Sequence, residues 1–441
     1  SSPGDAGLGG AGSGTTNPSG AASAGTGSGG ATTAGTGSGG TAAEGVAGPA
    51  RSWKPAVGYS LKLFVATRLG LGLVALIGIA VVPLSKAVPV PGWPTQVAHA
   101  GLSNLFTSWE RWDALWFLRI AAHGYRNSDG SAAFFPLYPL AVRGVSFLLG
   151  HHPLAAGLIV SNASFLGALI AFYRLTEREF SGQYARRASL YLAIFPTAFF
   201  FVAPYSESFF LLLVVGCFLF ARQRQWLLAG AVGALASATR SVGLVLVPAL
   251  ALEAWVQLQQ LRSSGLSAAA VARRAVRPAV GTAIASVGIL GYLAYWWRRT
   301  GHPMAPFSAQ GGWLRQATMP WTALYEGVHV MVRFLGTPNN GYQIIDVVLA
   351  AVVLAAGVWV IVKCPTSLGL YTLLSVLLPL TLVFPGRPLM SVPRFALTIF
   401  PLFWAIAALD ARLKNRELLV AASAAGLGLL TVLFVGWYFI F

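Results

Sequence analysis

The stretch IIDVVLAAVVLAAGVWVIVK, residues Ile344–Lys363, decides the class of fold to which this chain belongs. A helix needs about 20 predominantly apolar residues to cross the roughly 30 Å hydrocarbon core of a bilayer, and this stretch has that length. Leu61–Leu84 and Leu418–Phe441 are further stretches of the same kind. The 441 residues are 56% hydrophobic and 10% charged, whereas soluble domains carry about 25% charged residues. The sequence therefore predicts an all-α, polytopic transmembrane helix bundle.

The first part of the chain differs from the rest in composition. Residues 1–50 are rich in Gly, Ser, Ala and Thr, contain no Lys or Arg, and repeat AGTGSGG at 24–30 and 34–40. Such a segment buries too little apolar surface to offset the entropy that it would lose on ordering. We expect a disordered tail over residues 1–50 and a single membrane domain over residues 51–441.

The chain is strongly basic, with 30 Lys and Arg against 13 Asp and Glu and a formal net charge of +17. A charge of this size also occurs in nucleic-acid-binding proteins. Here, however, the basic residues lie mostly in short runs between apolar segments, as the positive-inside rule describes. We therefore expect the lipid bilayer, and no nucleic acid, as their partner. The runs predicted to be cytoplasmic are residues 174–187, 221–226, 271–277 and 410–417.

Turn signals divide the apolar segments into helices. We expect a hairpin of helices 188–202 and 207–221, and a segment 226–252 that is broken near Arg240. Segment 133–150 contains two prolines, which favours a partial passage through the membrane over a complete one. Later spans are predicted near 278–297, 344–363, 367–384, 395–409 and 418–441. The loops predicted on the outer side are 87–132, 298–343 and 385–394.

The stretch SWERWDALWFLRIAAHGY, Ser108–Tyr125, places a carboxylate among tryptophans in the first outer loop. Its apolar residues recur at helical spacing, which predicts an amphipathic helix lying in the membrane interface: Trp109, Trp112, Trp116 and Ile120. Asp113 follows Trp112 directly. A carboxylate at membrane depth is costly and marks a candidate functional site, and partial burial suits a general base. Alternatively, Asp113 caps a helix or pairs with Arg111 or Arg119.

Three further polar positions interrupt apolar sequence. Glu207 lies in the motif PYSES, where it forms part of a binding cavity or simply begins a helix. Arg240 lies in the middle of a long apolar segment and needs a carboxylate, a set of carbonyl groups or a phosphate as its partner. Arg387 and Arg394 lie in a proline-rich outer loop, at the height of a lipid-linked phosphate. Snorkelling of these arginines to the interface is the structural alternative.

Several motifs of soluble nucleotide and metal enzymes do not occur. The chain has no GxxxxGKS phosphate loop, no HExxH, no DxD pair and no Cys/His cluster, since its two cysteines lie far apart. We therefore expect no cofactor and leave metal dependence open.

The motifs taken together resemble a known family. RWDALWFLRIAAHGY followed closely by AFFPLYP, and later PYSES, ATRSVG and SVPRFALTIFPLF, resemble the PIG-V type of mannosyltransferase over residues 109–405. The resemblance implies a polytopic glycosyltransferase of the GT-C superfamily, with a polyprenyl-phosphate-mannose donor and a lipid-linked or cell-envelope glycan acceptor. Because this chain uses arginine in preference to lysine and begins with a Gly/Ser-rich tail, we expect a bacterial member. We expect it in the plasma membrane, with its site on the extracytoplasmic side.

Residue by residue, the resemblance places the family's Trp-Asp pair on Trp112 and Asp113. We expect Asp113 to be the catalytic base of an inverting transfer, and Arg394 and Arg240 to bind the donor phosphate. The residues expected to contact substrate are Trp112, Trp116, Tyr125, Tyr138, Tyr205 and Glu207. For the aromatic residues among them, a membrane-interface belt is the structural alternative. A lipid or glycan transporter is the alternative function, since broken helices and intramembrane arginines also occur in transporters.

Overall fold

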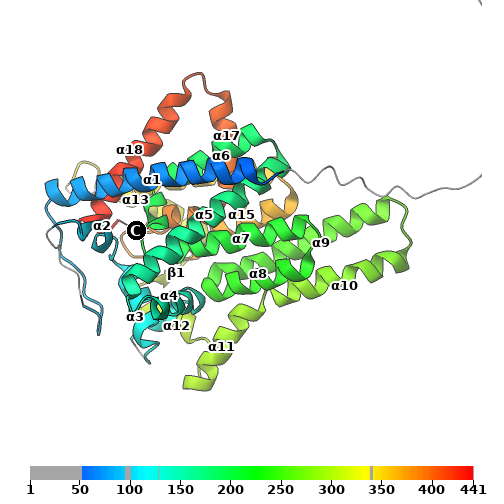
Figure 1. The fold of residues 1–441 in the computed structure, drawn as a ribbon, viewed down its shortest axis with the longest axis horizontal. Helices are drawn as coiled ribbons and strands as arrows, with labels where there is room; N and C mark the ends of the chain where they lie inside the picture. The colour runs from blue at the N-terminus through cyan, green and yellow to red at the C-terminus, as the bar shows by residue number, and fades with distance from the viewer. Residues whose placement is uncertain (1–51, 95–100, 128, 338–340, 441) are drawn as a thin grey trace, which may run out of the picture. The chain divides into compact units, whose positions relative to one another are not determined.

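The computed structural model describes residues 52–94, 101–127, 129–337 and 341–440. The regular secondary structure of these residues is helical apart from two strands of two residues each, which confirms the predicted all-α class (Figure 1). The expected tail, residues 1–50, lies outside the described residues, and its boundary with the membrane domain stays a prediction.

The helices of the first part of the chain are α1 (Lys54–Val81), α2 (Asn104–Thr107), α3 (Asp113–His123), η1 (Ser131–Ala133), α4 (Leu137–Leu148), α5 (Pro153–Glu179), α6 (Gly182–Ile194), η2 (Ala198–Phe201), α7 (Glu207–Arg222), α8 (Trp226–Thr239), η3 (Ser241–Val245) and α9 (Leu246–Ser263). The later elements are α10 (Ala268–Ile284), α11 (Val287–Thr300), α12 (Ala305–Gly312), β1 (Gln316–Ala317), α13 (Pro320–Arg333), α14 (Gly341–Lys363), α15 (Thr366–Leu377), η4 (Leu378–Thr381), β2 (Leu382–Val383), α16 (Val392–Ala396), α17 (Leu402–Arg412) and α18 (Arg416–Val435).

Six helical segments within the described residues are long and apolar enough to cross a bilayer: α1, α5, η3 with α9, α10 with α11, α14 and α18. The first of them shows how the bundle meets lipid. Its exposed side chains form an apolar stripe at every fourth position: Leu61, Val65, Leu69, Leu73, Ile77 and Val81. A soluble protein would place polar side chains on such an outward face. The chain is therefore a multi-pass membrane protein.

Two expectations about the path of the chain are confirmed. The long segment 226–252 breaks at Arg240, whose extended backbone separates α8 from the 3₁₀ turn η3. Gly243 permits this break, because a Cβ at its position would lie 2.5 Å from the Cα of Ser237. Helix α4 covers 12 residues, or about 18 Å at the helical rise. It is too short to cross the bilayer, as the prolines of segment 133–150 predicted.

The predicted interfacial helix around Asp113 is wrong in two respects. Helix α3 begins only at Asp113, because Trp112 has a positive φ of 54° that no α-helix contains. The residues Ala114 to Ala121 are all buried, since α4 and α5 pack against this helix. The three- and four-residue spacing correctly indicated a helix, but it could not show that protein covers the second face.

The basic segments predicted to share one side meet at one end of the bundle. Arg222 at the end of α7 pairs with Glu179 at the end of α5, and Arg187 on α6 pairs with Asp410 on α17. At this end α8 and α10 pack with their backbones in contact, and Figure 1 shows both helices in the same part of the bundle. A Cβ at Gly281 would overlap the carbonyl oxygen of Trp226.

The loop that leads into α3 is held by buried charged residues. Arg111, 1% exposed, donates to the carbonyl oxygens of Thr107 (2.8 Å), Glu110 (3.0 Å) and Val435 (3.0 Å). Glu110 is also 1% exposed and accepts a hydrogen bond of 2.7 Å from the indole N–H of Trp93. Burial raises the pKa of Glu110 to about 7, although the Trp93 bond and Arg111 both act to lower it.

The glycine contact between α8 and α10 can be tested by adding a single methyl group. We expect Gly281→Ala to destabilise the protein by about 1–3 kcal/mol, because backbone atoms cannot move aside as a side chain does. Gly291→Ala on α11 is the matched control, since a Cβ there meets nothing within 4 Å. The control should be neutral or slightly stabilising. Thermal unfolding in detergent, followed by tryptophan fluorescence, measures both; equal melting temperatures would contradict the contact.

The burial of Glu110 predicts a pH dependence of stability. Its carboxyl group titrates near pH 4.5 when exposed and near pH 7 in the folded protein. The folded state therefore holds more protons between these values, and stability should fall as the pH rises through this window. Glu110→Gln cannot ionise and should lose this part of the dependence. Melting temperatures from pH 5 to 8 for both proteins give the difference, and parallel curves would show that Glu110 is ionised throughout.

Candidate active site

Four charged side chains from distant parts of the sequence form one connected chain of ion pairs. Asp113 Oδ2 accepts from the guanidinium of Arg394 at 2.5 Å. The same guanidinium donates through Nε to Glu207 Oε1 at 2.6 Å, and this oxygen also accepts from Arg240 at 2.6 Å. The structure thus brings together the predicted base, both predicted phosphate ligands and one predicted substrate contact.

Three of these four side chains lie at the end of a helix. Asp113 is the first residue of α3, Glu207 is the first residue of α7, and Arg240 follows the last residue of α8. Arg394 lies on the short helix α16, between the proline-rich loop and α17. Helix ends bring polar side chains and unpaired backbone groups to the same place, so the broken helices of this bundle concentrate polarity in one region.

Asp113 is the accessible member of the cluster. Its side chain is 30% exposed, compared with 12% for Arg394, 11% for Arg240 and 0% for Glu207. Asp113 pairs with neither Arg111 nor Arg119, although both were possible partners from the sequence. Asp113 is therefore the carboxylate of the cluster that a substrate can reach.

Glu207 is a buried counter-ion between two arginines. The single oxygen Oε1 receives both guanidinium groups, while Oε2 is buried with no hydrogen-bond partner. Arg240 also donates to Ser206 Oγ at 3.0 Å. Arg240 therefore forms the structural ion pair that the sequence left open as an alternative, and Glu207 has no exposed surface through which to contact a substrate directly.

Tyr205 and Arg111 hold the backbone next to Asp113 in position. Tyr205 donates from its hydroxyl to the carbonyl oxygen of Arg111 at 3.0 Å, two residues before Asp113. The ring of Tyr205 lies beneath Arg394, with 4.8 Å between the guanidinium carbon and the ring centroid. The sequence indicated Tyr205 as a substrate contact, but at 1% exposure it positions the two charged residues instead. The sequence indicated Arg111 only as a possible partner for Asp113. It did not indicate that Arg111 holds the loop before α3 by binding backbone carbonyl oxygens.

Of the predicted tryptophans, Trp112 lies beside the cluster and Trp116 does not contact it. The ring of Trp112 packs against Trp437 and Phe439, and its indole N–H is buried with no partner. The backbone of Trp112 has a positive φ of 54°. Such a conformation at a large residue costs about 1–3 kcal/mol and persists only where the surrounding structure enforces it. Trp116 is 8% exposed and stacks on Phe134, so it is a core residue.

The two remaining predicted tyrosines pack against other side chains of the protein, Tyr125 half-buried and Tyr138 fully buried. Tyr125 donates to the carbonyl oxygen of Phe134 at 2.7 Å and packs in an aromatic cluster with Tyr292 and Trp296 on α11. Tyr138 is fully buried, with its hydroxyl 2.8 Å from Ser161 Oγ. The helical spacing and the aromatic content of the sequence could not show that these two side chains make such contacts within the protein.

Arg315 is a site residue that sequence reasoning missed. It donates to Ser391 Oγ at 3.0 Å and to the carbonyl oxygen of Leu382 at 3.4 Å. Burial lowers the pKa of Arg315, and the charges that act on it are those of Asp113, Arg394 and Arg240. The ladder of β1 with β2 holds this residue against the loop that leads to α16. In the sequence Arg315 stands out only as an isolated arginine in the middle of the predicted outer loop 298–343.

The cluster therefore carries an excess of positive charge. The guanidinium groups of Arg240 and Arg394 pair with the two carboxylates of Asp113 and Glu207. Arg315 is close enough for the charges of Asp113, Arg394 and Arg240 to act on it, and it has no carboxylate partner among the described residues. An anion with several acceptor oxygens would balance this charge. Arg387, which the sequence grouped with Arg394, belongs elsewhere: it pairs with Asp346 at 2.7 Å and binds the carbonyl oxygens of Phe439 and Ile440.

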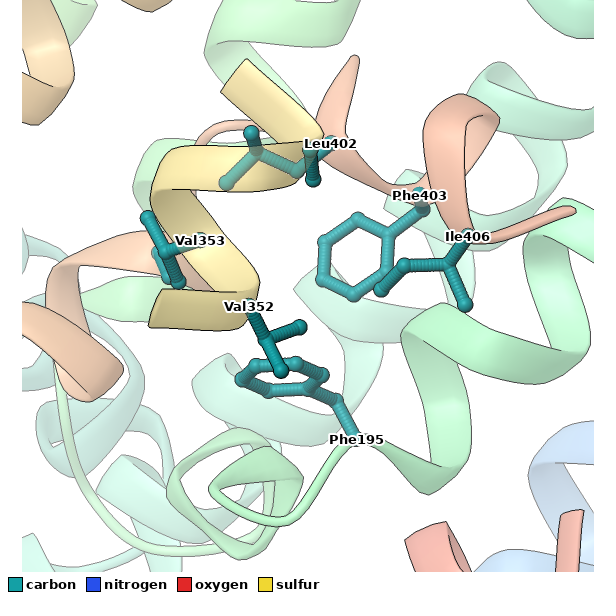
Figure 2. Close-up of a pocket in the computed structure, with 8 residues that line it drawn as sticks. Phe195, Val352, Val353, Leu402, Phe403 and Ile406 are labelled. Carbon is teal, nitrogen blue, oxygen red and sulfur yellow. The ribbon is translucent and has the colours of Figure 1, made fainter. Parts of the chain in front are cut away.

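A small cavity near α16 is apolar and unsuited to a sugar. Figure 2 shows Phe195, Val352, Val353, Leu402, Phe403 and Ile406 around it. Its volume of about 10 Å³ is about that needed for one water molecule. Among the residues that the structure describes, no three His, Cys, Asp or Glu side chains come together in a way that could hold a metal ion.

Curated relatives match parts of this chain. GPI mannosyltransferase 2 of Cryptococcus neoformans is 34% identical over 145 residues, 30% of this chain and 34% of that protein. The protein of the same name from Aspergillus fumigatus is 30% identical over 218 residues, 45% of this chain and 44% of its own length. The chain thus spans between a third and a half of the length of these relatives.

Two solved structures match this chain at low sequence identity. ArnT from Cupriavidus metallidurans, solved with undecaprenyl phosphate, is 14% identical, covers 84% of this chain and 63% of its own, and superposes with a TM-score of 0.47. The Archaeoglobus fulgidus oligosaccharyltransferase, also 14% identical, covers 85% of this chain and 53% of its own with a TM-score of 0.43. Neither likeness is close enough to transfer a residue's role.

A family model gives the firmer result. The model described as mannosyltransferase (PIG-V) matches residues 59–295, more than half of the chain. The match includes Asp113, Glu207 and Arg240 of the ion-pair cluster. The chain belongs to the PIG-V mannosyltransferase family.

Proposed function

We propose that this protein is an inverting mannosyltransferase that moves mannose from a polyprenyl-phosphate-mannose donor to a lipid-linked or cell-envelope glycan acceptor. Membership of the PIG-V family supports the sugar and the reaction type. One observation carries the mechanism: the accessible carboxylate of Asp113 lies against a cluster that holds three arginines and a net positive charge. These are the groups that a phosphate leaving group and a hydroxyl nucleophile require.

One carboxylate is sufficient for this reaction. Hydrolytic glycosidases use two, because an alkoxide leaving group must be protonated as the glycosidic bond breaks. A polyprenyl phosphate leaves as a stable anion and needs positive charge near it more than a proton donor. In the proposed step the acceptor oxygen bonds to C1 of mannose and the bond from C1 to the phosphate oxygen breaks. Asp113 takes the hydroxyl proton, and the product has the inverted anomeric configuration.

The ion pair between Asp113 and Arg394 suggests how the donor prepares the site. In the structure Arg394 occupies the Oδ2 oxygen of Asp113, which would make it a poor base. The donor phosphate offers Arg394 a second anionic partner, and Arg315 lies nearby without a carboxylate. Transfer of Arg394 from Asp113 to the phosphate would free the carboxylate for the acceptor proton. Glu207 would keep Arg394 in place throughout, because its own contact is made through Nε.

The position of the cluster favours an enzyme over the transporter alternative. Asp113, Glu207 and Arg240 all lie at helix ends, on the side of the bundle away from the four basic segments. A transport site lies near the midplane of the membrane, between matched halves. Under the positive-inside rule the basic end is cytoplasmic, so the site would open on the extracytoplasmic side of the plasma membrane.

The proposed base is tested by removing its charge. We expect Asp113→Asn to reduce mannose transfer by about 100-fold or more, because the amide cannot accept the acceptor proton. The assay uses purified protein in nanodiscs with radiolabelled polyprenyl-phosphate mannose and a mixed membrane-lipid extract, and measures label in new glycolipid. Glu326→Gln, an exposed acid on α13, is the matched control and should retain activity. Near-normal transfer by a well-folded Asp113→Asn protein would exclude the base.

The missed arginine gives an independent test of phosphate binding. We expect Arg315→Ala to lower kcat/KM for the donor by about 10- to 100-fold, since a charge-assisted hydrogen bond to a charged group contributes about 1.5–3 kcal/mol. Arg333→Ala on α13 removes an equally positive but exposed side chain and should leave the donor kinetics unchanged. The measurement is kcat/KM for the donor at a saturating concentration of acceptor. Equal values for the two variants would place the phosphate away from Arg315.

A further inference from the structure

A second positively charged site lies at the other end of α8. A cavity of about 440 Å³ opens between the start of α8, the last turns of α9 and the middle of α10. The residues that line it include the exposed arginines Arg224, Arg273, Arg274 and Arg277, together with Trp226. Helix α8 is 14 residues long, or about 21 Å, and Arg240 of the candidate active site follows its last residue. The cavity is therefore a separate site.

The arginines of this cavity lack the partners that their neighbours have. At the same end of the bundle Arg222 pairs with Glu179 and Glu253, and Arg187 pairs with Asp410. Within the described part of the chain, no carboxylate pairs with any of the four cavity arginines. Glu253, which lies on α9, is already engaged by Arg222, Gln257 and Ser367. Four arginines thus line one concavity to which the described residues contribute no carboxylate partner.

The backbone around the cavity favours an anion as well. Arg224 has a positive φ of 59°, a conformation that a large side chain adopts only when the turn between α7 and α8 imposes it. Helix α8 begins after Gln225 without a side-chain cap, so its first N–H groups and the positive end of its dipole lie at the cavity wall. Helices α8 and α10, which both line the cavity, are in backbone contact at Gly230 and Gly281.

The surroundings of the cavity identify the source of the anion. Trp255 on α9 and Val276 and Val280 on α10 are exposed large apolar side chains. Both helices belong to segments of membrane-spanning length and composition. A ligand held here would have its charged part among the arginines and apolar chains beside these residues. We propose that this cavity binds the phosphate-bearing headgroup of an anionic membrane lipid, whose acyl chains lie along α9 and α10.

Retention of lipid by purified protein tests this site. The triple variant Arg273→Gln, Arg274→Gln, Arg277→Gln removes three cavity charges. The matched control Arg412→Gln, Lys414→Gln, Arg416→Gln removes three exposed charges from the connection between α17 and α18, which does not line the cavity. Native mass spectrometry after detergent exchange counts the phosphatidylglycerol that each protein retains. Wild type and control should keep bound lipid, and the cavity variant should lose most of it.

A second variant protects the test against misfolding. Arg224→Gly removes one cavity charge and places glycine at a positive φ, so we expect a folded protein with weakened lipid binding. Melting temperatures are then measured with added phosphatidylglycerol, phosphatidylcholine or inorganic phosphate. Stabilisation by phosphatidylglycerol alone, reduced in both cavity variants and kept in the control, supports the site. Equal lipid retention by the cavity and control triples would overturn it, as would full stabilisation by inorganic phosphate.

Discussion

The carboxylate of Glu207, shared by two arginines, is the interaction on which the candidate active site depends. Breaking a buried ion pair by removing one partner typically costs about 3–5 kcal/mol, and here one oxygen serves Arg240 and Arg394 together. These residues come from α7, the end of α8 and α16, so one acid determines how three segments meet. With Glu207 satisfied inside the protein, Asp113 is left as the carboxylate of the cluster that faces outward. The difference in burial therefore makes Glu207 the acid that holds the cluster together and Asp113 the acid that a substrate can reach.

The polar elements of this chain could be found from the sequence because a membrane protein has so few of them. Asp113, Glu207, Arg240 and Arg394 each interrupt apolar surroundings, and the structure joins them in one chain of ion pairs. The aromatic residues could not be sorted in this way. Tyr125 and Tyr138 carry the same signal as Trp112, yet Tyr138 is a core residue and Tyr125 packs half-buried in an aromatic cluster, because the sequence shows a helical face without showing what covers it. Arg315 was missed since its placement depends on the pairing of two two-residue strands that lie more than 60 positions apart in the sequence.

Helix ends are used in opposite ways at the two ends of α8. Near Arg240 the positive groups are partly neutralised by carboxylates that the fold supplies, which leaves a modest excess of charge next to an accessible acid. Near Trp226 the arginines have no such partners, and the protein relies on its surroundings for neutralisation. A reaction site benefits from the first arrangement, because its charge must be available to a substrate that enters and leaves. The second arrangement suits a ligand that remains bound.

Arg111 links the loop that leads into α3 to the end of α18. Its guanidinium binds the carbonyl oxygen of Val435 and lies over the ring of Trp437, while Trp112 packs against Trp437 and Phe439. The loop that presents Asp113 therefore takes one of its backbone contacts from a residue 324 positions later in the sequence. We expect this loop to reach its folded position only when α18 is packed against it, because α18 and the residues after it supply Val435, Trp437 and Phe439.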